Sequence, residues 1–111
     1  VEMAQLLIEK HPESLRHADN GGRLPIHIAA KVNSPGFCQV LIEAYPGSER
    51  IGHSNGALPL HYACWHNNVA TVEFLCKLFP DAVNHAITNG RYPIHVAIYS
   101  LRERADPEGV T

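Results

Sequence analysis

Histidine follows proline at one fixed spacing three times, in LPIHIAA (residues 24–30), LPLHYAC (residues 58–64) and YPIHVAI (residues 92–98). Histidine is the commonest metal ligand and the side chain that titrates nearest to neutral pH. His27, His61 and His95 are therefore candidates for a metal site or for a general base. Either chemistry would require these side chains to come together, so the elements that carry them decide whether it is possible.

An interval of 34 residues separates these histidines, and the same interval governs prolines and glycines, which indicates an internal repeat. Proline suits the first position of a helix or stops one, and glycine tolerates the positive φ angles of tight turns. The residues that share the interval are Pro25, Pro59 and Pro93, then Pro12, Pro46 and Pro80, and then Gly22, Gly56 and Gly90.

Helical periodicity fills the segments between these marks. Apolar residues at helical spacing predict a helix of about three turns over each of residues 3–11, 37–45 and 71–79, and the proline that follows ends it. Ser34 before Pro35 is a typical N-cap signal. Each unit is thus a glycine-bearing turn, a short helix that opens with Pro-x-His, a tight connection and a second helix. One unit cannot cover its own apolar face, so the units must stack.

This stacking separates the histidines. Neighbouring helices pack roughly 8–10 Å apart, and equivalent side chains point in parallel. Two nitrogens on one zinc ion must lie within roughly 4 Å of each other, so His27, His61 and His95 cannot share a metal. A histidine at the third helical position can instead accept a hydrogen bond from the unpaired N–H at the helix start, while its other nitrogen bonds a turn carbonyl. We expect all three to be structural.

Other patterns with chemical potential are weaker. Cys64 and His66 form one Cys-x-His pair without a second pair at ligand spacing. The sequence contains no P-loop and no Gly-x-Ser-x-Gly pattern, and no nucleophile is accompanied by a base. We expect no catalytic residue, no cofactor and no metal.

The repeated pattern resembles the ankyrin repeat, whose first helix starts with Gly-x-Thr-Pro-Leu-His-x-Ala. GALPLHYA (residues 56–63) is the nearest match, beside GRLPIHIA (residues 22–29) and GRYPIHVA (residues 90–97). The threonine before proline is replaced by Leu24, Leu58 and Tyr92, and the repeat is a 34-residue variant. The resemblance implies an all-α solenoid of stacked helix-turn-helix units with hairpin-like loops. In this family the histidine is structural.

The register predicts one domain fragment over residues 1–111. Residues 1–18 are the second helix and exit turn of a partial repeat, residues 19–52 and 53–86 are complete repeats, and residues 87–111 begin another. The cap signal at Asp106 and Pro107 comes four residues later than Ser34 and Pro35 would predict. We therefore expect an insertion of about four residues in the last unit, in a longer first helix.

The resemblance also implies a concave face of turn tips and first helices that binds proteins. The turn positions are Asn20, Arg23, Ser54, Asn55, Thr88, Asn89 and Arg91, and the helix positions are Lys31, Trp65, His66 and Tyr99. Lys31, Trp65 and Tyr99 occupy equivalent positions, 34 residues apart, and should form a row with a spacing of about 10 Å. Tryptophan and tyrosine are favoured binding anchors, although Trp65 would also serve as a packing residue on the adjacent helix.

Composition limits the partners. The chain has 111 residues, 45% of them hydrophobic, and a net charge of −2, which disfavours nucleic acid and anionic membranes. No apolar run approaches the roughly 18 residues that span a bilayer. Three cysteines without tight spacing indicate a reducing, intracellular compartment, cytoplasmic or nuclear.

We expect a monomeric, non-enzymatic protein-binding module that takes an extended, partly acidic segment of its partner. The alternatives are a regulatory or substrate-recruiting arm of a larger enzyme, such as a kinase or ubiquitin ligase, and a structural spacer.

Overall fold

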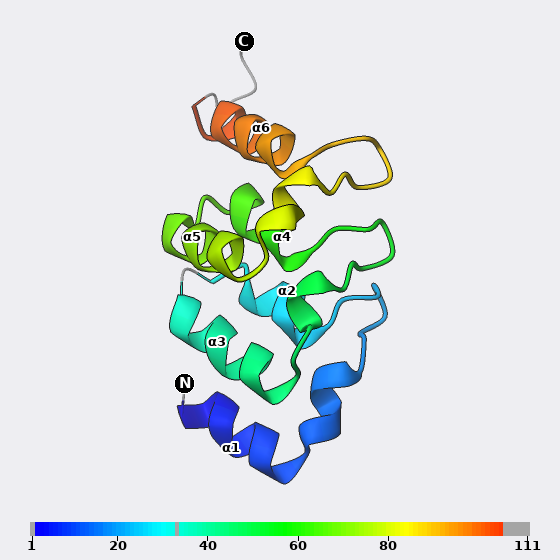
Figure 1. Cartoon of the computed structure of the whole chain (residues 1–111), viewed down its shortest axis with the longest axis vertical. Helices are drawn as coiled ribbons and strands as arrows, with labels where there is room; N and C mark the ends of the chain where they lie inside the picture. The colour runs from blue at the N-terminus through cyan, green and yellow to red at the C-terminus, as the bar shows by residue number, and fades with distance from the viewer. Residues whose placement is uncertain (1, 33, 106–111) are drawn as a thin grey trace.

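The chain forms a stack of short helices in a computed structural model that describes residues 2–32 and 34–105 (Figure 1). No strand occurs among these residues, so the predicted all-α class is confirmed. The α-helices are α1 (Glu2–Lys10), α2 (Pro25–Ala29), α3 (Pro35–Ala44), α4 (Pro59–Trp65), α5 (Val69–Leu78) and α6 (Pro93–Ala105), and the 3-10 helices are η1 (Pro12–Arg16), η2 (Ser48–Arg50) and η3 (Pro80–Asn84).

The helices form two columns. In Figure 1, α1, α3 and α5 lie one above another along the left side, α2, α4 and α6 stack beside them, and the glycine-bearing turns project together to the right. The resulting body is elongated, with a longest dimension of 49 Å. This arrangement places every turn next to the equivalent turn of the neighbouring repeat.

Local sequence signals account for the helix boundaries. Proline occupies the first turn of α2, α3 and α4, where its missing N–H costs nothing. The Ser34 hydroxyl accepts a hydrogen bond from the Phe37 N–H at 3.3 Å, so the predicted N-cap is present. The predicted second helices are present as α1, α3 and α5, and each ends shortly before its proline.

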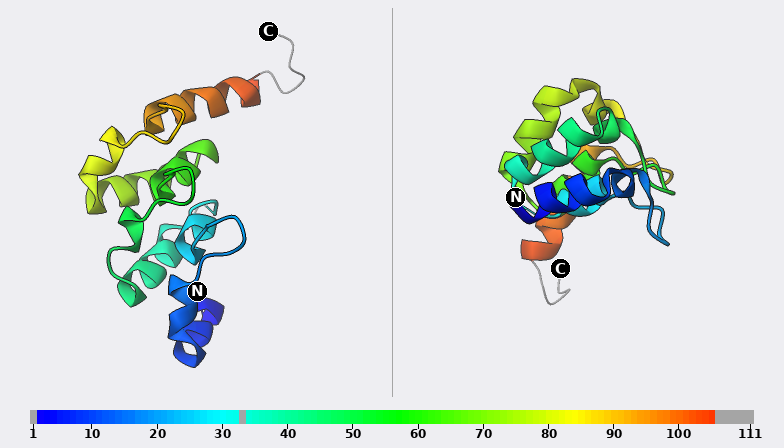
Figure 2. Two further views of the ribbon diagram at one scale, coloured as in Figure 1. Left: turned by 90° about the vertical axis from the view of Figure 1, so that its right-hand side faces the viewer. Right: turned by 90° about the horizontal axis from the view of Figure 1, so that it is seen from below.

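The first helix of the last unit, α6, is longer than the first helices α2 and α4 of the preceding repeats. It has 13 residues, against 7 in α4 and 5 in α2. This length agrees with the insertion expected in the last unit, although Asp106 and Pro107 lie outside the described residues and the insertion stays a prediction. Figure 2 shows α6 reaching beyond the helices beneath it.

A single apolar core runs between the columns. Ala30, Ala63 and Cys38 have no exposed surface, which allows neighbouring helices to approach closely. The side-chain amide of Asn68 donates to the Ala30 carbonyl at 3.0 Å and so ties the start of α5 to the end of α2. The larger members of the core are Leu15, Leu24, Ile26, Leu41, Ile42, Leu58, Leu60, Leu75 and Val96.

The turns repeat one hydrogen-bonded geometry. In the second turn the Gly56 N–H donates to the His53 carbonyl at 2.8 Å, and the His53 N–H donates to the Ala57 carbonyl at 3.0 Å. Gly22, Gly56 and Gly90 adopt φ angles of 81°, 84° and 81°. A side chain would strain this left-handed backbone, which explains why glycine recurs at these positions.

The histidines of the Pro-x-His pattern tie the start of each first helix to the end of its repeat. The Leu24 N–H donates to His27 Nδ1 and the Leu58 N–H donates to His61 Nδ1, both at 2.9 Å. Because Nδ1 accepts, the proton of the neutral ring is on Nε2. His27 Nε2 then donates to the Ile51 carbonyl at 2.7 Å, and His61 Nε2 to the His85 carbonyl at 2.9 Å. These carbonyls end the repeat that carries the histidine and lie just before the turn of the following repeat, so the contact fixes the first helix to the segment that leads into the next turn.

His95 makes the same first contact. The Tyr92 N–H donates to its Nδ1 at 2.9 Å. The ring packs beside Tyr92, with a distance of 5.7 Å between the ring centroids. The helix-start contact expected from the sequence is therefore present at all three positions, and His27 and His61 also form the hydrogen bond to the carbonyl before the next turn.

Stability should fall in mild acid because these imidazoles are neutral. Burial lowers the pKa of both His27 and His61 below the ordinary value of 6.5. Below that value the unfolded chain binds protons that the folded chain does not, so folded-state stability is lost as the pH falls towards the lower folded pKa. We expect the urea midpoint to decrease between about pH 7.5 and about pH 5.5.

A double variant, His27→Gln with His61→Gln, provides the control. Glutamine at the third helical position can accept through its amide oxygen and donate through its nitrogen, but does not titrate. Its urea midpoint should depend less on pH than that of the parent chain. An equal pH dependence in both proteins would contradict the role given to the two histidines.

Replacement of either of two glycines by alanine should change the free energy of unfolding, in opposite directions at the two positions. Gly56→Ala places a Cβ on a backbone with φ 84° and should cost about 1–2 kcal/mol of unfolding free energy. Gly36→Ala lies in α3, where no atom is within 4 Å of the new Cβ, and should add about 0.5–1 kcal/mol. Urea denaturation of both variants measures the two shifts, and equal signs would refute the turn assignment.

Candidate functional site

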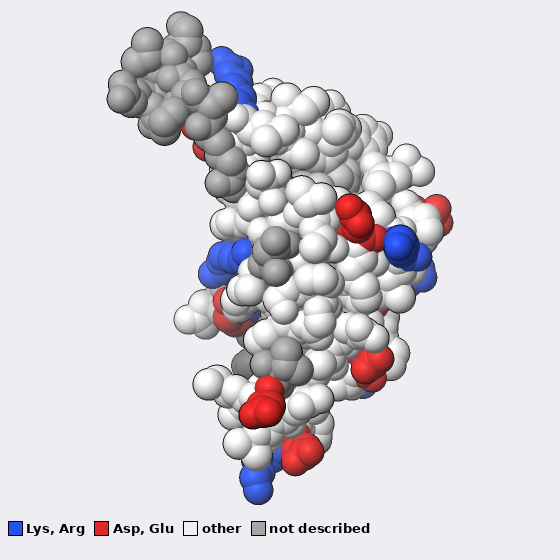
Figure 3. All heavy atoms as spheres, turned by 90° about the vertical axis from the view of Figure 1, so that its left-hand side faces the viewer, with Lys and Arg blue, Asp and Glu red and all other residues white. Residues whose placement is uncertain are grey.

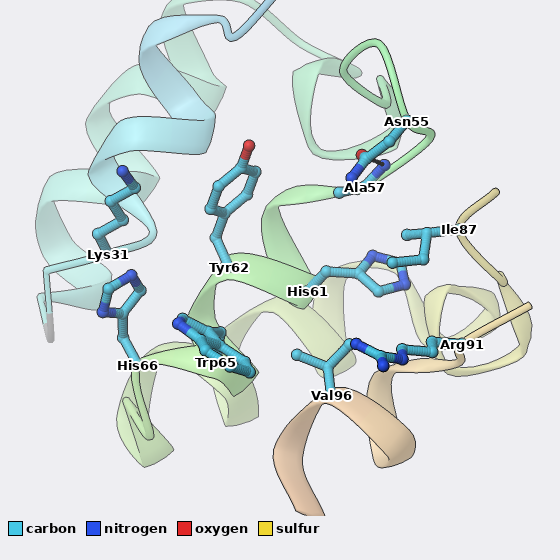
Figure 4. Close-up of a pocket in the computed structure, with 10 residues that line it drawn as sticks. All are labelled: Lys31, Asn55, Ala57, His61, Tyr62, Trp65, His66, Ile87, Arg91 and Val96. Carbon is cyan, nitrogen blue, oxygen red and sulfur yellow. Dashed lines mark hydrogen bonds between the residues drawn. The ribbon is translucent and has the colours of Figure 1, made fainter. Parts of the chain in front are cut away.

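A cavity of about 470 Å³ opens between α4, α6 and the neighbouring turns (Figure 4). Lys31 and His66 lie at one side of it, Arg91 lies at the other, and Trp65 stands between them. Its ten lining residues are Lys31, Asn55, Ala57, His61, Tyr62, Trp65, His66, Ile87, Arg91 and Val96.

Part of the predicted binding surface lines this cavity. Five predicted residues do so, and they come from three consecutive repeats: Lys31, Asn55, Trp65, His66 and Arg91. The other six predicted residues, Asn20, Arg23, Ser54, Thr88, Asn89 and Tyr99, lie outside its lining. Sequence reasoning missed Tyr62, Ile87 and Val96. Tyr62 and Val96 occupy equivalent positions of the repeat, between the histidine and the alanine. The residue type varies at this position, and this variation could have indicated a binding surface.

Trp65 and Tyr62 form an aromatic wall of the cavity, and Tyr99 lies outside its lining. Trp65 is 37% exposed, and Tyr99, near the cavity on α6, is 40% exposed. The Ser100 hydroxyl donates to the Trp65 carbonyl and so fixes the end of α4 against α6. Trp65 therefore combines an ordered backbone with a side chain that solvent reaches.

The Tyr62 ring is positioned by histidines of two repeats. Its centroid lies 5.6 Å from that of His27 and 5.7 Å from that of His53. Burial raises the pKa of Tyr62 and lowers that of His53. A neutral phenol and an imidazole of lowered pKa thus stand together at this edge of the cavity.

Two cations lie at opposite sides of the cavity. The Lys31 ammonium lies 5.7 Å above the Tyr62 ring, and the Arg91 guanidinium lies 4.4 Å above the Tyr99 ring. Both are cation–π contacts, which hold long side chains over aromatic surface. Among the residues that the structure describes, no Asp or Glu lines the cavity.

Arg23 lies outside the lining of the cavity. Its Nε lies 3.4 Å from the Asp19 carboxylate, so its charge is paired within its own turn. Hydrogen bonding by the Arg23 backbone N–H, the largest cause, lowers the pKa of Asp19. Of the two arginines predicted at turn positions of the concave face, only Arg91 lines the cavity.

The polar turn residues mainly hold their own turns. The Asn55 side-chain oxygen accepts from the Ala57 N–H at 2.9 Å, and that of Asn89 accepts from the Arg91 N–H at 3.1 Å. The Ser54 hydroxyl donates to the Gly21 carbonyl at 3.3 Å and joins two adjacent turns. Asn20 and Thr88 are exposed.

The described residues do not gather metal ligands. No group of three or more His, Cys, Asp or Glu side chains within residues 2–32 and 34–105 is placed to hold a metal ion. Both ring nitrogens of His61, the histidine deepest in the cavity wall, already have hydrogen-bond partners.

One face of the molecule shows how the charges are distributed. On the side that Figure 3 draws, Lys and Arg are scattered among Asp and Glu and do not form a patch of one sign. Within the described part of the chain, no helix is long and apolar enough to cross a membrane.

Comparison with known proteins agrees with this geometry. The family model described as ankyrin repeats (3 copies) matches residues 1–86. No curated protein matches the chain at a significant level. Ankyrin repeats are generally protein–protein interaction modules, and the family is generally non-catalytic. The match covers most of the chain, and the chain belongs to the ankyrin repeat family.

Proposed function

We propose that the chain is a non-catalytic interaction module that binds an extended, partly acidic segment of a partner protein across the cavity beside Trp65. The observation that carries this proposal is the composition of the cavity: a solvent-accessible tryptophan, two cations held over aromatic rings, and no carboxylate among the described residues of the lining.

The aromatic wall provides the anchor. Tryptophan and tyrosine bury large area at low cost in side-chain entropy, and they are enriched among the residues that dominate binding energy. Trp65 offers this area beside Val96, and its backbone is already fixed by Ser100. A bulky apolar side chain of the partner would fill this space.

The charges favour acidic neighbours of that side chain. Lys31 and Arg91 come from different repeats and line the same cavity. Each is confined by the aromatic ring beneath it, so less side-chain entropy is lost when a carboxylate binds. Charges at such a rim mainly increase the association rate and give it a salt dependence.

The repeat spacing suits an extended ligand. Equivalent positions in stacked helices recur at about 10 Å, and an extended chain advances about 3.3 Å per residue. Every third side chain of the ligand would therefore meet the row of Lys31, Trp65 and Tyr99. The face that carries this row is the one that the family uses as its concave surface.

The cysteines support an intracellular setting. Cys38 and Cys64 are buried and Cys76 is partly buried, and none of the three forms a disulfide. Burial raises the pKa of the Cys38 and Cys64 thiols to about 11, which keeps them protonated and unreactive.

Selection from a random peptide library tests this function. We expect the recovered peptides to combine a bulky apolar residue with nearby acidic residues, and their affinity to fall with increasing salt. Trp65→Ala and Tyr99→Ala together should weaken binding at least about tenfold, the loss typical of central aromatic anchors. Titration calorimetry measures both effects, and circular dichroism confirms that the variants are folded.

The charge requirement has a matched control. Lys31→Ala with Arg91→Ala should weaken binding and reduce its salt dependence, whereas Lys77→Ala with Arg102→Ala removes the same net charge outside the cavity and should change neither. Equal effects of the two pairs would reject the cavity as the acidic-segment site. Selected peptides that bind equally well to the Trp65→Ala, Tyr99→Ala variant would reject the proposed surface.

A further inference from the structure

The cavity beside Trp65 has a counterpart one repeat earlier in the chain. Most residues of its lining have an equivalent 34 residues before them, so the two places can be compared side chain by side chain. The pairs that differ or correspond most informatively are His61 and His27, Ile87 and His53, and Val96 and Tyr62.

In the earlier repeat, a ring of the chain itself fills the space. The centroid of the half-buried Tyr62 ring lies 5.6 Å from that of His27 and 5.7 Å from that of His53. The two imidazole centroids lie 6.2 Å apart, and all three distances are those of packed aromatic pairs. The Lys31 ammonium lies 5.7 Å from the centroid of the same Tyr62 ring. These side chains form a site built around one phenol ring.

One repeat later, the equivalent place carries smaller side chains. Val96 ends in two methyl groups where Tyr62 carries a ring, and Ile87 replaces an imidazole. Val96 points from α6 into the cavity, on the side of His61 (Figure 4). His61 is 3% exposed and both of its ring nitrogens have hydrogen-bond partners, so its ring is already fixed in position. The cavity of about 470 Å³ therefore lies where the earlier repeat places its ring.

We propose that an aromatic side chain of the partner enters this space and packs against His61 in the way that Tyr62 packs against His27. This occupant rests on the proposed function, since it names the residue of the extended segment that enters the cavity. Charge complementarity connects the ring to that segment: Lys31 and Arg91 line the same cavity and favour acidic residues beside the ring.

The lining favours a ring over an aliphatic side chain. Trp65 is 37% exposed and lines the cavity together with the imidazole of His61. Aromatic pairs attract each other through the charge distribution of their rings, in addition to the area that they bury. A leucine or isoleucine would bury area without this attraction. Val96 thus determines specificity, because its small size leaves room for the ring.

Two small probes test this occupant without a partner protein. N-acetyl-tyrosinamide carries the ring, and N-acetyl-leucinamide carries an aliphatic side chain on the same backbone. Each is titrated into the isotopically labelled chain while the amide NMR signals are recorded. We expect saturable shifts at Ile87 and Val96 with the tyrosine compound, in the millimolar range that suits so small a ligand. The leucine compound should bind about fivefold more weakly.

A variant that fills the cavity from within has a matched control. Val96→Tyr should abolish the binding of N-acetyl-tyrosinamide. Val83→Tyr adds the same ring outside the lining, at a residue that is 47% exposed, and should leave this binding unchanged. Circular dichroism confirms that both variants are folded. Equal affinity of the parent chain for the two probes, or binding of the tyrosine compound that survives Val96→Tyr in the folded variant, would overturn the proposal.

The peptide selection separates this occupant from the proposed function. An aromatic residue beside the acidic residues of the recovered peptides would support both. Leucine, isoleucine or methionine at that position, in peptides that still require Trp65 and Tyr99, would overturn the aromatic occupant and leave the proposed function in place. Binding of N-acetyl-tyrosinamide in the cavity, together with peptides that do not depend on Lys31 and Arg91, would support the aromatic occupant and reject the acidic segment.

Discussion

The neutral imidazole of His27, repeated at His61, holds together the three parts on which the structure depends. One nitrogen accepts from the N–H at the start of its own helix, and the other donates to a carbonyl that leads into the next turn. The start of the first helix, the end of its repeat and the approach to the next turn are thus fixed by a single buried ring. Because both roles require the singly protonated ring, burial that lowers its pKa and the two hydrogen bonds favour the same protonation state.

The cavity beside Trp65 depends on this connection. Asn55 and Arg91 reach it from turns, whereas Lys31 and Trp65 reach it from the ends of first helices. Their relative positions are set by the stacking of one repeat on the next, including the hydrogen bond from Ser100 to the Trp65 carbonyl. The surface is therefore a property of the junctions between repeats, and no single repeat contains it.

Linear stacking also explains the contrast between the middle and the ends of the molecule. Each repeat contacts only its neighbours, so an apolar residue is covered only where a neighbour exists. Leu41 and Leu75 lie inside the stack and are buried, and their equivalent Leu7 lies at its edge and is exposed. The same sequence position thus serves as core in one repeat and as accessible surface in another.

Much of the fold could be predicted because its signals are local and recur. Proline fixes helix starts, glycine at φ angles near 80° fixes the turns, and the interval of 34 residues repeats both, so the helices and the all-α class could be predicted from the sequence. The helix-start role of His27 was equally accessible, because a residue at the third helical position can reach back to the unpaired N–H. Its second partner, the carbonyl of Ile51, lies 24 residues away and was not specified by any local pattern.

The candidate site was predictable only in part, for the same reason. Equivalent positions could be counted along the chain, and Lys31, Trp65 and Arg91 of the predicted surface line one cavity. The pairing of Arg23 with Asp19 and the position of Tyr62 between two histidines depend on side-chain directions. The sequence by itself determined the repeat, its helices and its turns, because these arise from backbone preferences within a few residues. Only the tertiary structure decided which side chains line the cavity and which apolar residues stay exposed, because both follow from contacts between repeats that are far apart in the chain.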